Sequence, residues 1–455
     1  MQKPTLIKAV ALAVAALGAT AASAQSSLTI YGNLDVAYTN VNKKQGNVAG
    51  TVLPAASFAT SGTVNGITSS VSSVNALGFR GTEDLGGGYK GNFVLEGQMQ
   101  LDTGAQSGQD GRMWGRQAYL GLTTPYGEVR LGRQYAPMFY TFAGTTVEAL
   151  GGADLQGVGL VLNNLQVRQD NQVSYWLKAG GFTGAVSYSP NAGAATRISS
   201  ARTVNGSITS TSGQIVGGVS AGTEDDTERG RSYGLFLNYG FPFGLMLSGA
   251  YNQNDFAGTP IGPAAQAFDY FRAEKYKSFA LAAKYTVPST GTVISGQWHE
   301  GELETSAAAA GTLATGLPAP APATLPTAGV NVGDIKTRTF SLGVKHPIGN
   351  FSVGLQLSRT EFTNFTEGKD TAFMLIGDYN FSKRTRLYIR AGQMKDDRGN
   401  ATAFGTTAAG NLALAGGPFP LLTGLGNLET PFFSGGGAHV DAKTTVVAVG
   451  IRHQF

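Results

Sequence analysis

The sequence predicts an all-β fold, a transmembrane antiparallel β-barrel of about sixteen strands. Three observations support this prediction. Long segments alternate apolar and polar residues, which is the period of a strand whose two faces meet different surroundings. Short turns alternate with long loops, as they do between the two rims of an outer-membrane barrel. Alternating segments also occupy residues 28–40 and 443–455, so we expect the first and last strands to pair and close the barrel.

The clearest hairpin spans residues 75–101. Leu77 and Phe79 mark one face of the first arm, and the alternation resumes after a short turn at 85–88. The turn also matches the spacing of the dinucleotide-binding fingerprint, with glycines at positions 86, 88 and 91. That fingerprint requires a helix to follow. A period of two follows instead, so we interpret the glycines as a hairpin turn.

Six further strand pairs follow this hairpin. Their predicted ranges are 116–124 with 128–133, 173–177 with 182–188, 231–241 with 245–254, 278–287 with 292–304, 335–346 with 351–361, and 371–381 with 385–395. The predicted long loops are 41–73, 102–113, 191–228, 255–274, 305–334, 364–370 and 396–441. Residues 135–166 also lack alternation, but they are too apolar for a solvated outer loop, and we expect them to pack against protein.

The N-terminus reads as a secretory signal. Lys3 and Lys8 precede the apolar run 9–19, and Ala22-Ser23-Ala24 forms a small-residue cleavage motif. We therefore predict removal of residues 1–24, which leaves the barrel domain at 25–455. The apolar run is too short for a membrane-spanning helix, and no later window approaches 18 consecutive apolar residues.

The composition agrees with an exported barrel. Glycine accounts for 65 of 455 residues, aromatics for 10%, charged residues for only 14%, and cysteine is absent. Such a chain has many turns and a large apolar outer face, and closed backbone hydrogen bonding can replace disulfides. Without the two lysines of the signal, 31 basic residues face 29 acids. A net charge near +2 is too small to indicate a nucleic-acid partner.

No catalytic, metal or cofactor site is predicted, and we do not expect an enzyme. The four histidines, at positions 299, 346, 439 and 453, have no metal-ligand spacing. The acidic pairs Asp225-Asp226 and Asp396-Asp397 lie in predicted outer loops. Solvated loop charge is the simpler interpretation of these pairs, and a divalent-cation site is the alternative.

Several arginines lie on the polar side of predicted strands. Arg386 and Arg390 bracket Tyr388, and Arg130 shares its parity with Glu128. A charge on the lipid side costs about 2–4 kcal/mol near the bilayer midplane. These three arginines should therefore point into the barrel, either as constriction residues or only as solvated charges of the lumen.

Taken together, these motifs resemble a Gram-negative general porin of the beta-proteobacterial type. The residues that bear the resemblance are 28–32 (LTIYG), 77–88 (LGFRGTEDLGGG), 116–122 (RQAYLGL), 131–134 (LGRQ) and the terminal Phe455. The resemblance extends over the whole mature chain. It implies a multi-pass protein of the outer membrane, surrounded by lipid and assembled as a homotrimer. Phe455 would then serve as the signal that the outer-membrane assembly machinery reads.

The resemblance also implies a function. Such porins form water-filled channels for passive diffusion of small hydrophilic solutes and ions, and their third loop folds inward to narrow the channel. Here that loop corresponds to 135–166. Arg116 and Arg168 fall where the family places wall arginines, and Glu148 and Asp154 are the loop acids expected to face them.

Two positions depart from simple expectations. The family commonly has an arginine directly before the Leu-Gly-Phe motif, where this chain has Ala76. Arg116 shares its parity with Ala118 and Leu120, so an inward Arg116 would place Tyr119 on the outside. Three alternative functions remain open: a substrate-specific pore, a barrel that acts as an adhesin or receptor through its long loops, and an outer-membrane hydrolase.

Overall fold

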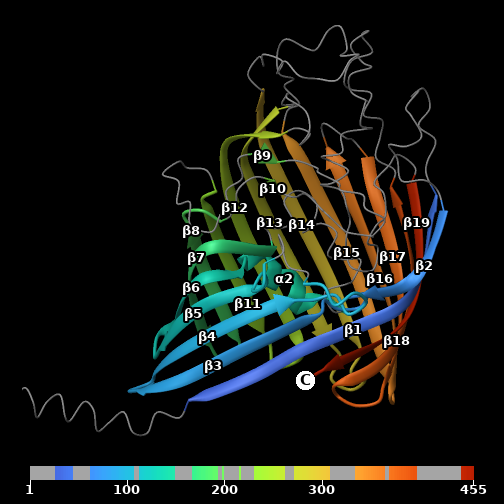
Figure 1. Cartoon of the computed structure of the whole chain (residues 1–455), viewed down its shortest axis with the longest axis horizontal. Coiled ribbons are helices and arrows are strands. Elements are labelled where there is room, and N and C mark those ends of the chain that lie inside the picture. The colour runs from blue at the N-terminus through green and yellow to red at the C-terminus, as the bar shows by residue number, and fades with distance from the viewer. Residues whose placement is uncertain are drawn as a thin grey trace, which may run out of the picture.

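The computed structural model describes residues 26–44, 62–106, 112–148, 167–192, 197–198, 215–216, 230–261, 271–307, 334–363, 368–396 and 442–455. The predicted signal 1–24 lies outside these residues. The described strands form a closed, tilted antiparallel barrel (Figure 1). In this part of the chain no helix is both long and apolar enough to cross a membrane.

The barrel closes where its first and last strands meet. β1 (Ser27–Lys44) pairs antiparallel with β19 (Ala442–Gln454), from Asn33 opposite Gln454 to Lys44 opposite Lys443. The other edge of β1 pairs with β2 (Gly62–Ser69) along its second half and with β3 (Ala76–Gly86) along its first half. β2 and β3 therefore act as one barrel strand in two segments.

The remaining wall runs in sequence order. It consists of β4 (Tyr89–Gln98), β5 (Gln117–Thr124), β6 (Gly127–Tyr135), β7 (Arg168–Ala179), β8 (Phe182–Ser189), β11 (Ser232–Gly240), β12 (Leu245–Ile261), β13 (Phe271–Thr286), β14 (Val293–Ala307), β15 (Ile335–Ile348), β16 (Phe351–Thr363), β17 (Gly368–Asn380), β18 (Thr385–Asp396) and β19. The two-residue strands β9 (Arg197–Ile198) and β10 (Ile215–Val216) pair with each other, while β8 pairs directly with β11. With β9 and β10 set aside, the described residues form sixteen wall strands, which confirms the predicted fold.

Each strand separates its two faces by residue parity. On β18, Leu387 and Ile389 are 41% and 51% exposed on the outside, whereas Tyr388 and Arg390 are 3% and 0% exposed on the inside. Lipid would cover the outer apolar side chains in a membrane, which removes the cost of their exposure. The same parity holds on β19, where Val447, Ile451 and other outward residues end at Phe455.

The glycine-rich turn is a hairpin turn, as predicted. β3 ends at Gly86 and β4 begins at Tyr89. Gly86, Gly87 and Gly88 have φ angles of 81°, 61° and 83°. Side-chain-bearing residues rarely adopt this left-handed region, so the turn requires glycine there.

Several predicted loops are shorter in the structure. β2 lies inside the predicted loop 41–73, and β12 extends to Ile261 within the predicted loop 255–274. Exposed polar residues such as Thr63 and Asn65 conceal β2 from a search for alternation. Asn40 donates to Asn65 across β1 and β2 on the outer side, where the sequence offers no apolar marker.

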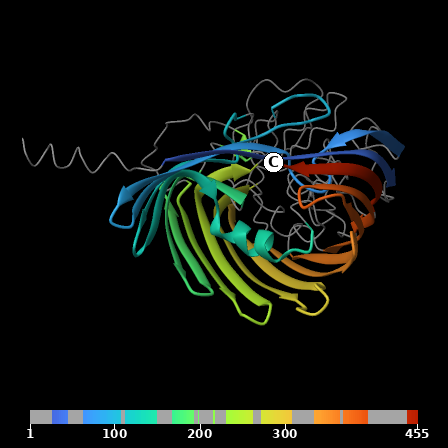
Figure 2. The same ribbon diagram turned by 90° about the horizontal axis from the view of Figure 1, so that it is seen from below.

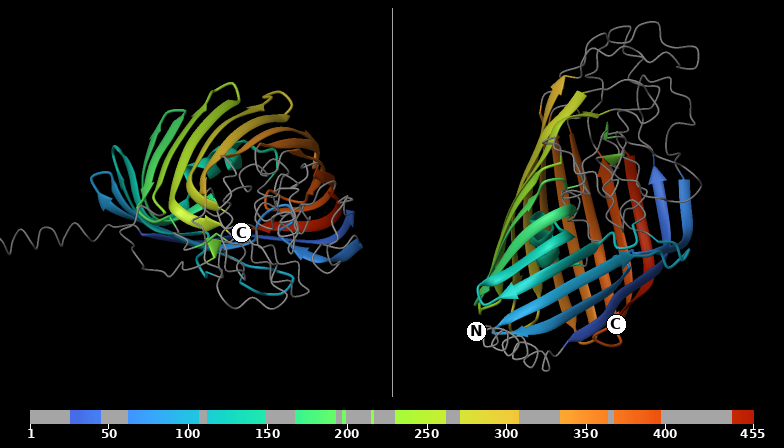
Figure 3. Two further views of the ribbon diagram at one scale, coloured as in Figure 1. Left: turned by 90° about the horizontal axis from the view of Figure 1, so that it is seen from above. Right: turned by 60° about the vertical axis from the view of Figure 1, so that its left-hand side comes forward.

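After β6 the chain turns into the barrel. Residues 136–148, here called the inward loop, begin with helix α2 (Pro137–Thr145), which lies inside the wall (Figures 2 and 3). Pro137 occupies the start of the helix, where a missing N–H costs no hydrogen bond. Met138 and Phe142 are buried and pack against Ala250 and Ala280, whose small side chains leave room for them. The helix itself was not predicted.

Wall side chains hold the end of the helix. Gln297 Nε2 donates to Thr145 Oγ1 at 2.8 Å and to Phe142 O at 3.3 Å. Lys284 Nζ donates to Gly144 O. A cation at a helix C-terminus also interacts favourably with the helix dipole. These contacts attach α2 to β13 and β14.

Candidate channel constriction

Two groups of charged side chains lie on the inner wall at the two ends of the inward loop. The Glu148 cluster comprises Ser72, Glu148, Asp378, Arg386 and Arg390. The Tyr135 cluster comprises Tyr31, Glu96, Arg116, Tyr135 and Arg168. Their geometry defines what the lumen presents to a solute.

Glu148 is bound by two arginines of β18. Its Oε1 lies 3.1 Å from Arg386 Nη2, and its Oε2 lies 2.7 Å from Arg390 Nη2. Ser72 Oγ donates to Oε1 at 2.7 Å. Burial by itself raises the pKa of Glu148, but the guanidinium groups of Arg390 and Arg386 outweigh it and lower the pKa to about 2. The carboxylate is therefore charged at neutral pH.

The wall side of the Glu148 cluster contains a second carboxylate. Asp378 Oδ1 accepts from Arg390 Nη2 at 2.8 Å, and Asp378 Oδ2 lies 3.3 Å from Arg386 Nη1. Arg390 Nη1 also donates to the carbonyl oxygens of Gly377 and Ile389. Lys345 Nζ approaches Asp378 to 2.5 Å. Three cations therefore contact two carboxylates directly, and most of the charge is neutralised within the cluster.

Ser72 reaches this cluster because the connection between β2 and β3 bends inward. Asp35 of β1 accepts hydrogen bonds from Val71 N at 3.1 Å, from Ser72 N at 3.2 Å and from Tyr388 Oη at 2.7 Å. Asn75 Oδ1 accepts from Asp35 N. This network joins β1, β18 and the end of the inward loop. The network was not predictable from the sequence, because residues 41–73 show no alternation.

The Tyr135 cluster lies where the inward loop leaves the wall. Arg116 Nε donates to Glu96 Oε1 at 2.5 Å, and Arg116 Nη2 donates to Tyr135 Oη at 2.6 Å. Arg168 holds its guanidinium carbon 5.0 Å from the centre of the Tyr135 ring. Tyr31 Oη donates to Glu96 Oε2 at 2.9 Å. The cluster contains two guanidinium groups and one carboxylate, so it keeps a net positive charge.

Arg116 points inward, but the expected outward position of Tyr119 is wrong. Leu120 is 68% exposed on the outside, and Tyr119 has the opposite parity. The Tyr119 ring lies inside, 5.2 Å from the guanidinium carbon of Arg130. Arg116 precedes the first residue of β5, Gln117, so strand parity does not extend to it.

The prediction that Glu148 faces Arg116 and Arg168 is also wrong. The inward loop passes β11 to β14 through α2, and its residue Thr146 accepts a 3.1 Å hydrogen bond from Gln356 of β16. It then reaches β18, so Glu148 meets the arginines of that strand. Arg116 is paired instead with Glu96, which was not singled out although it is an acid on the polar face of a strand. Asp154 lies outside the described residues.

The structure places the other predicted arginines on the inner wall. Arg386 and Arg390 belong to the Glu148 cluster. Arg130 pairs with Glu128 at 2.7 Å, lies 4.7 Å from the Trp176 ring centre and belongs to neither cluster. Within the described residues, no group of three His, Cys, Asp or Glu side chains could hold a metal ion.

A barrel with an apolar exterior, charged side chains in its lumen and a loop folded inside defines an outer-membrane channel. Comparison with known proteins identifies the family. The sequence matches the Gram-negative porins over residues 11–399, and the chain belongs to that family.

Full-length relatives agree with this assignment. Outer membrane porin protein 32 of Delftia acidovorans is 26% identical over 98% of this chain and 99% of its own length. An outer membrane porin protein of Bordetella pertussis is 29% identical over the whole of both chains. Among solved structures, an anion-selective porin from Comamonas acidovorans superimposes with a TM-score of 0.60, with 23% identity over 95% of this chain and 100% of that one.

The chain is therefore an outer-membrane porin of a Gram-negative bacterium, and it crosses the membrane many times. Both the family and the fold indicate a channel rather than an enzyme.

Proposed function

We propose that the channel passes small hydrophilic solutes and ions by passive diffusion, with a preference for anions. The observation that supports this most directly is the Tyr135 cluster. There Arg116 pairs with Glu96 and Arg168 lies over the Tyr135 ring, so two guanidinium groups stand beside a single carboxylate at the base of the inward loop. The loop, proposed to extend over 135–166, narrows the lumen at this level.

The preference follows from electrostatics. A fixed charge acts on an ion within roughly one Debye length, about 8 Å at physiological salt. In a narrowed passage every permeating ion comes within that range. The solved porin from Comamonas acidovorans that shares this fold is described as anion-selective. Ala76 stands where the family commonly has a further arginine, so the preference should be modest.

Reversal potentials in a salt gradient test this proposal. Arg116→Ala and Arg168→Ala should each shift the potential towards cation preference, and the shift should shrink as salt rises. Arg338→Ala is the matched control, because this arginine lies on an outward face with its side chain 50% exposed, paired with Glu300. If both lumen variants keep the wild-type potential at low salt, the Tyr135 cluster does not line the conducting path.

We also propose a homotrimer in outer-membrane lipid, inserted by the assembly machinery after cleavage behind Ala24. The family resemblance supports the trimer, and the N-terminal motif supports the cleavage site. Chemical cross-linking of intact membranes should yield a three-subunit band, and intact-mass measurement should give a chain that begins at Gln25. A monomer under both native and cross-linked conditions would exclude the trimer.

A further inference from the structure

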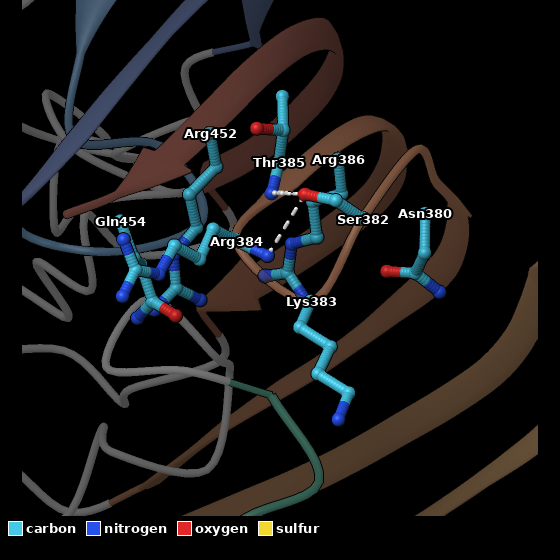
Figure 4. A pocket seen from close by; sticks show the side chains of 8 residues that line it. All are labelled: Asn380, Ser382, Lys383, Arg384, Thr385, Arg386, Arg452 and Gln454. Atoms are coloured by element: carbon cyan, nitrogen blue, oxygen red, sulfur yellow. Dashed lines mark hydrogen bonds between the residues drawn. The ribbon is translucent and has the colours of Figure 1, made fainter.

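A basic pocket lies at the rim formed by the short turns, apart from the Tyr135 cluster. Its volume is about 100 Å³, and it opens to solvent beside the turn between β17 and β18 (Figure 4). Short turns mark the periplasmic side of an outer-membrane barrel. Its lining residues are Asn380, Ser382, Lys383, Arg384, Thr385, Arg386, Arg452 and Gln454. Four of these eight are cationic and none is acidic.

The arginines of this pocket come from three places in the chain. Arg384 belongs to the turn, Arg386 to β18 and Arg452 to β19, and in Figure 4 their side chains extend towards one common space while Lys383 points away. In the described part of the chain the Arg384 guanidinium has no hydrogen-bond or ion-pair partner. Arg386 Nε is likewise buried without a partner there.

The other contacts of these arginines fix them from outside the pocket. Arg386 uses Nη1 and Nη2 on Asp378 and Glu148 of the Glu148 cluster. Arg452 Nε donates to Asn33 Oδ1 at 2.6 Å. Two of the three cationic groups are therefore positioned before any ligand arrives, which lowers the entropy cost of binding.

Neutral groups complete the lining. Ser382 Oγ accepts hydrogen bonds from Arg384 N at 3.1 Å and Thr385 N at 3.0 Å, so its own hydrogen can be donated elsewhere. The Gln454 amide and the Asn380 amide also line the space. The pocket therefore offers donors on several sides.

We propose that this pocket binds a small oxyanion with two or more negative charges, such as phosphate or a dicarboxylate, at the periplasmic mouth. Converging guanidinium groups repel one another, and an oxyanion between them converts this repulsion into charge-assisted hydrogen bonds. Guanidinium groups match carboxylate and phosphate oxygens by bidentate geometry. The site goes beyond the proposed diffusion and selectivity, because it binds its ligand at equilibrium and lies below the inward loop.

The test measures binding of inorganic phosphate to the purified, detergent-solubilised full chain by isothermal titration calorimetry at low salt. We expect saturable binding with one phosphate per chain. Arg384→Gln and Arg452→Gln should each weaken it by about tenfold or more. Arg80→Gln is the matched control. It removes the same charge from another side chain that faces the lumen, but Arg80 stacks on Tyr31 and does not line the pocket. It should leave the affinity unchanged.

Competition identifies the ligand chemistry. Succinate should displace phosphate, whereas acetate at the same concentration should not. The proposal would be overturned if phosphate binding is not saturable, or if Arg80→Gln weakens it as much as the pocket variants do. It would also be overturned if the purified chain binds isolated cell-wall sacculi and neither phosphate nor succinate displaces them. Binding in detergent does not depend on conduction, so failure here is distinct from failure of the reversal-potential test.

Discussion

The end of the inward loop is attached to β18 by one carboxylate, that of Glu148. Its side chain is fully buried between Arg386 and Arg390, with oxygen–nitrogen distances of 3.1 and 2.7 Å. Glu148→Gln keeps the shape of the side chain and removes the charge. The amide group would then direct N–H donors towards guanidinium groups that are themselves donors, so at least one contact must be lost.

The size of the effect follows from burial. Removing one partner of a buried ion pair costs about 3–5 kcal/mol, because the other charge is left uncompensated. For Glu148→Gln we expect a cost at the lower end of this range, because Arg390 still contacts Asp378 and two backbone carbonyl oxygens. At about 1.4 kcal/mol per factor of ten, the population with a detached loop should rise by about two orders of magnitude.

Single-channel recording in planar bilayers measures this population. We expect Glu148→Gln to close, or switch between conductance levels, far more often than the wild type. Glu128→Gln is the matched control: this glutamate also pairs with a lumen arginine, Arg130, at 2.7 Å, but that pair belongs to β6 and lies away from the Glu148 cluster. It should alter conductance without adding closures. If Glu148→Gln records like the wild type while folding to the same yield, the Glu148 cluster does not hold the loop.

Three further outcomes are expected. Arginine neighbours hold the pKa of Glu148 at about 2 despite its burial. The contribution of Glu148 to holding the loop is therefore complete above the ordinary pKa of 4.5 and disappears as the pH falls towards 2. Bilayer recordings should show extra closures only at that acid extreme. Deleting Phe455, whose backbone exchanges two 3.1 Å hydrogen bonds with Gly32, should reduce the yield of folded barrel while export continues; a normal yield in membrane fractions would contradict this. His299 is fully buried against Phe142, and its ring nitrogens have no partner among the described residues. His299→Leu should therefore leave the urea-unfolding midpoint unchanged or raise it. A clearly lower midpoint would show that the ring has a partner.

The barrel was predictable because two solvents act on each strand. Lipid outside and water inside select opposite residues at alternate positions, as Leu387 and Tyr388 illustrate. Beyond the hydrocarbon region both faces are polar, and the selection ends. Residues on β2 such as Thr63 and Asn65 therefore left no pattern, although β2 continues the wall.

The site was only partly predictable for a related reason. The cost of burying charge in lipid places Arg386 and Arg390 inside from sequence alone. Their partner depends on the path of a loop, and that path depends on the packing of α2 against small residues such as Ala250 and Ala280. The role of Glu96 was predictable, because an acid within a strand requires a counter-charge inside the barrel.

The distribution of arginines alone does not determine where an anion is attracted. In the Glu148 cluster, Arg386, Arg390 and Lys345 contact two carboxylates directly, so most of their charge is neutralised within the wall. In the Tyr135 cluster and the periplasmic pocket, cations outnumber acids. Less compensated positive charge therefore occurs in the Tyr135 cluster and at Arg384 and Arg452 of the pocket, whereas Arg386 of the pocket is already paired with Glu148 and Asp378. Moving an arginine between these environments should change selectivity even when the net charge of the chain stays the same, because an anion responds to the charge that its neighbours leave unpaired.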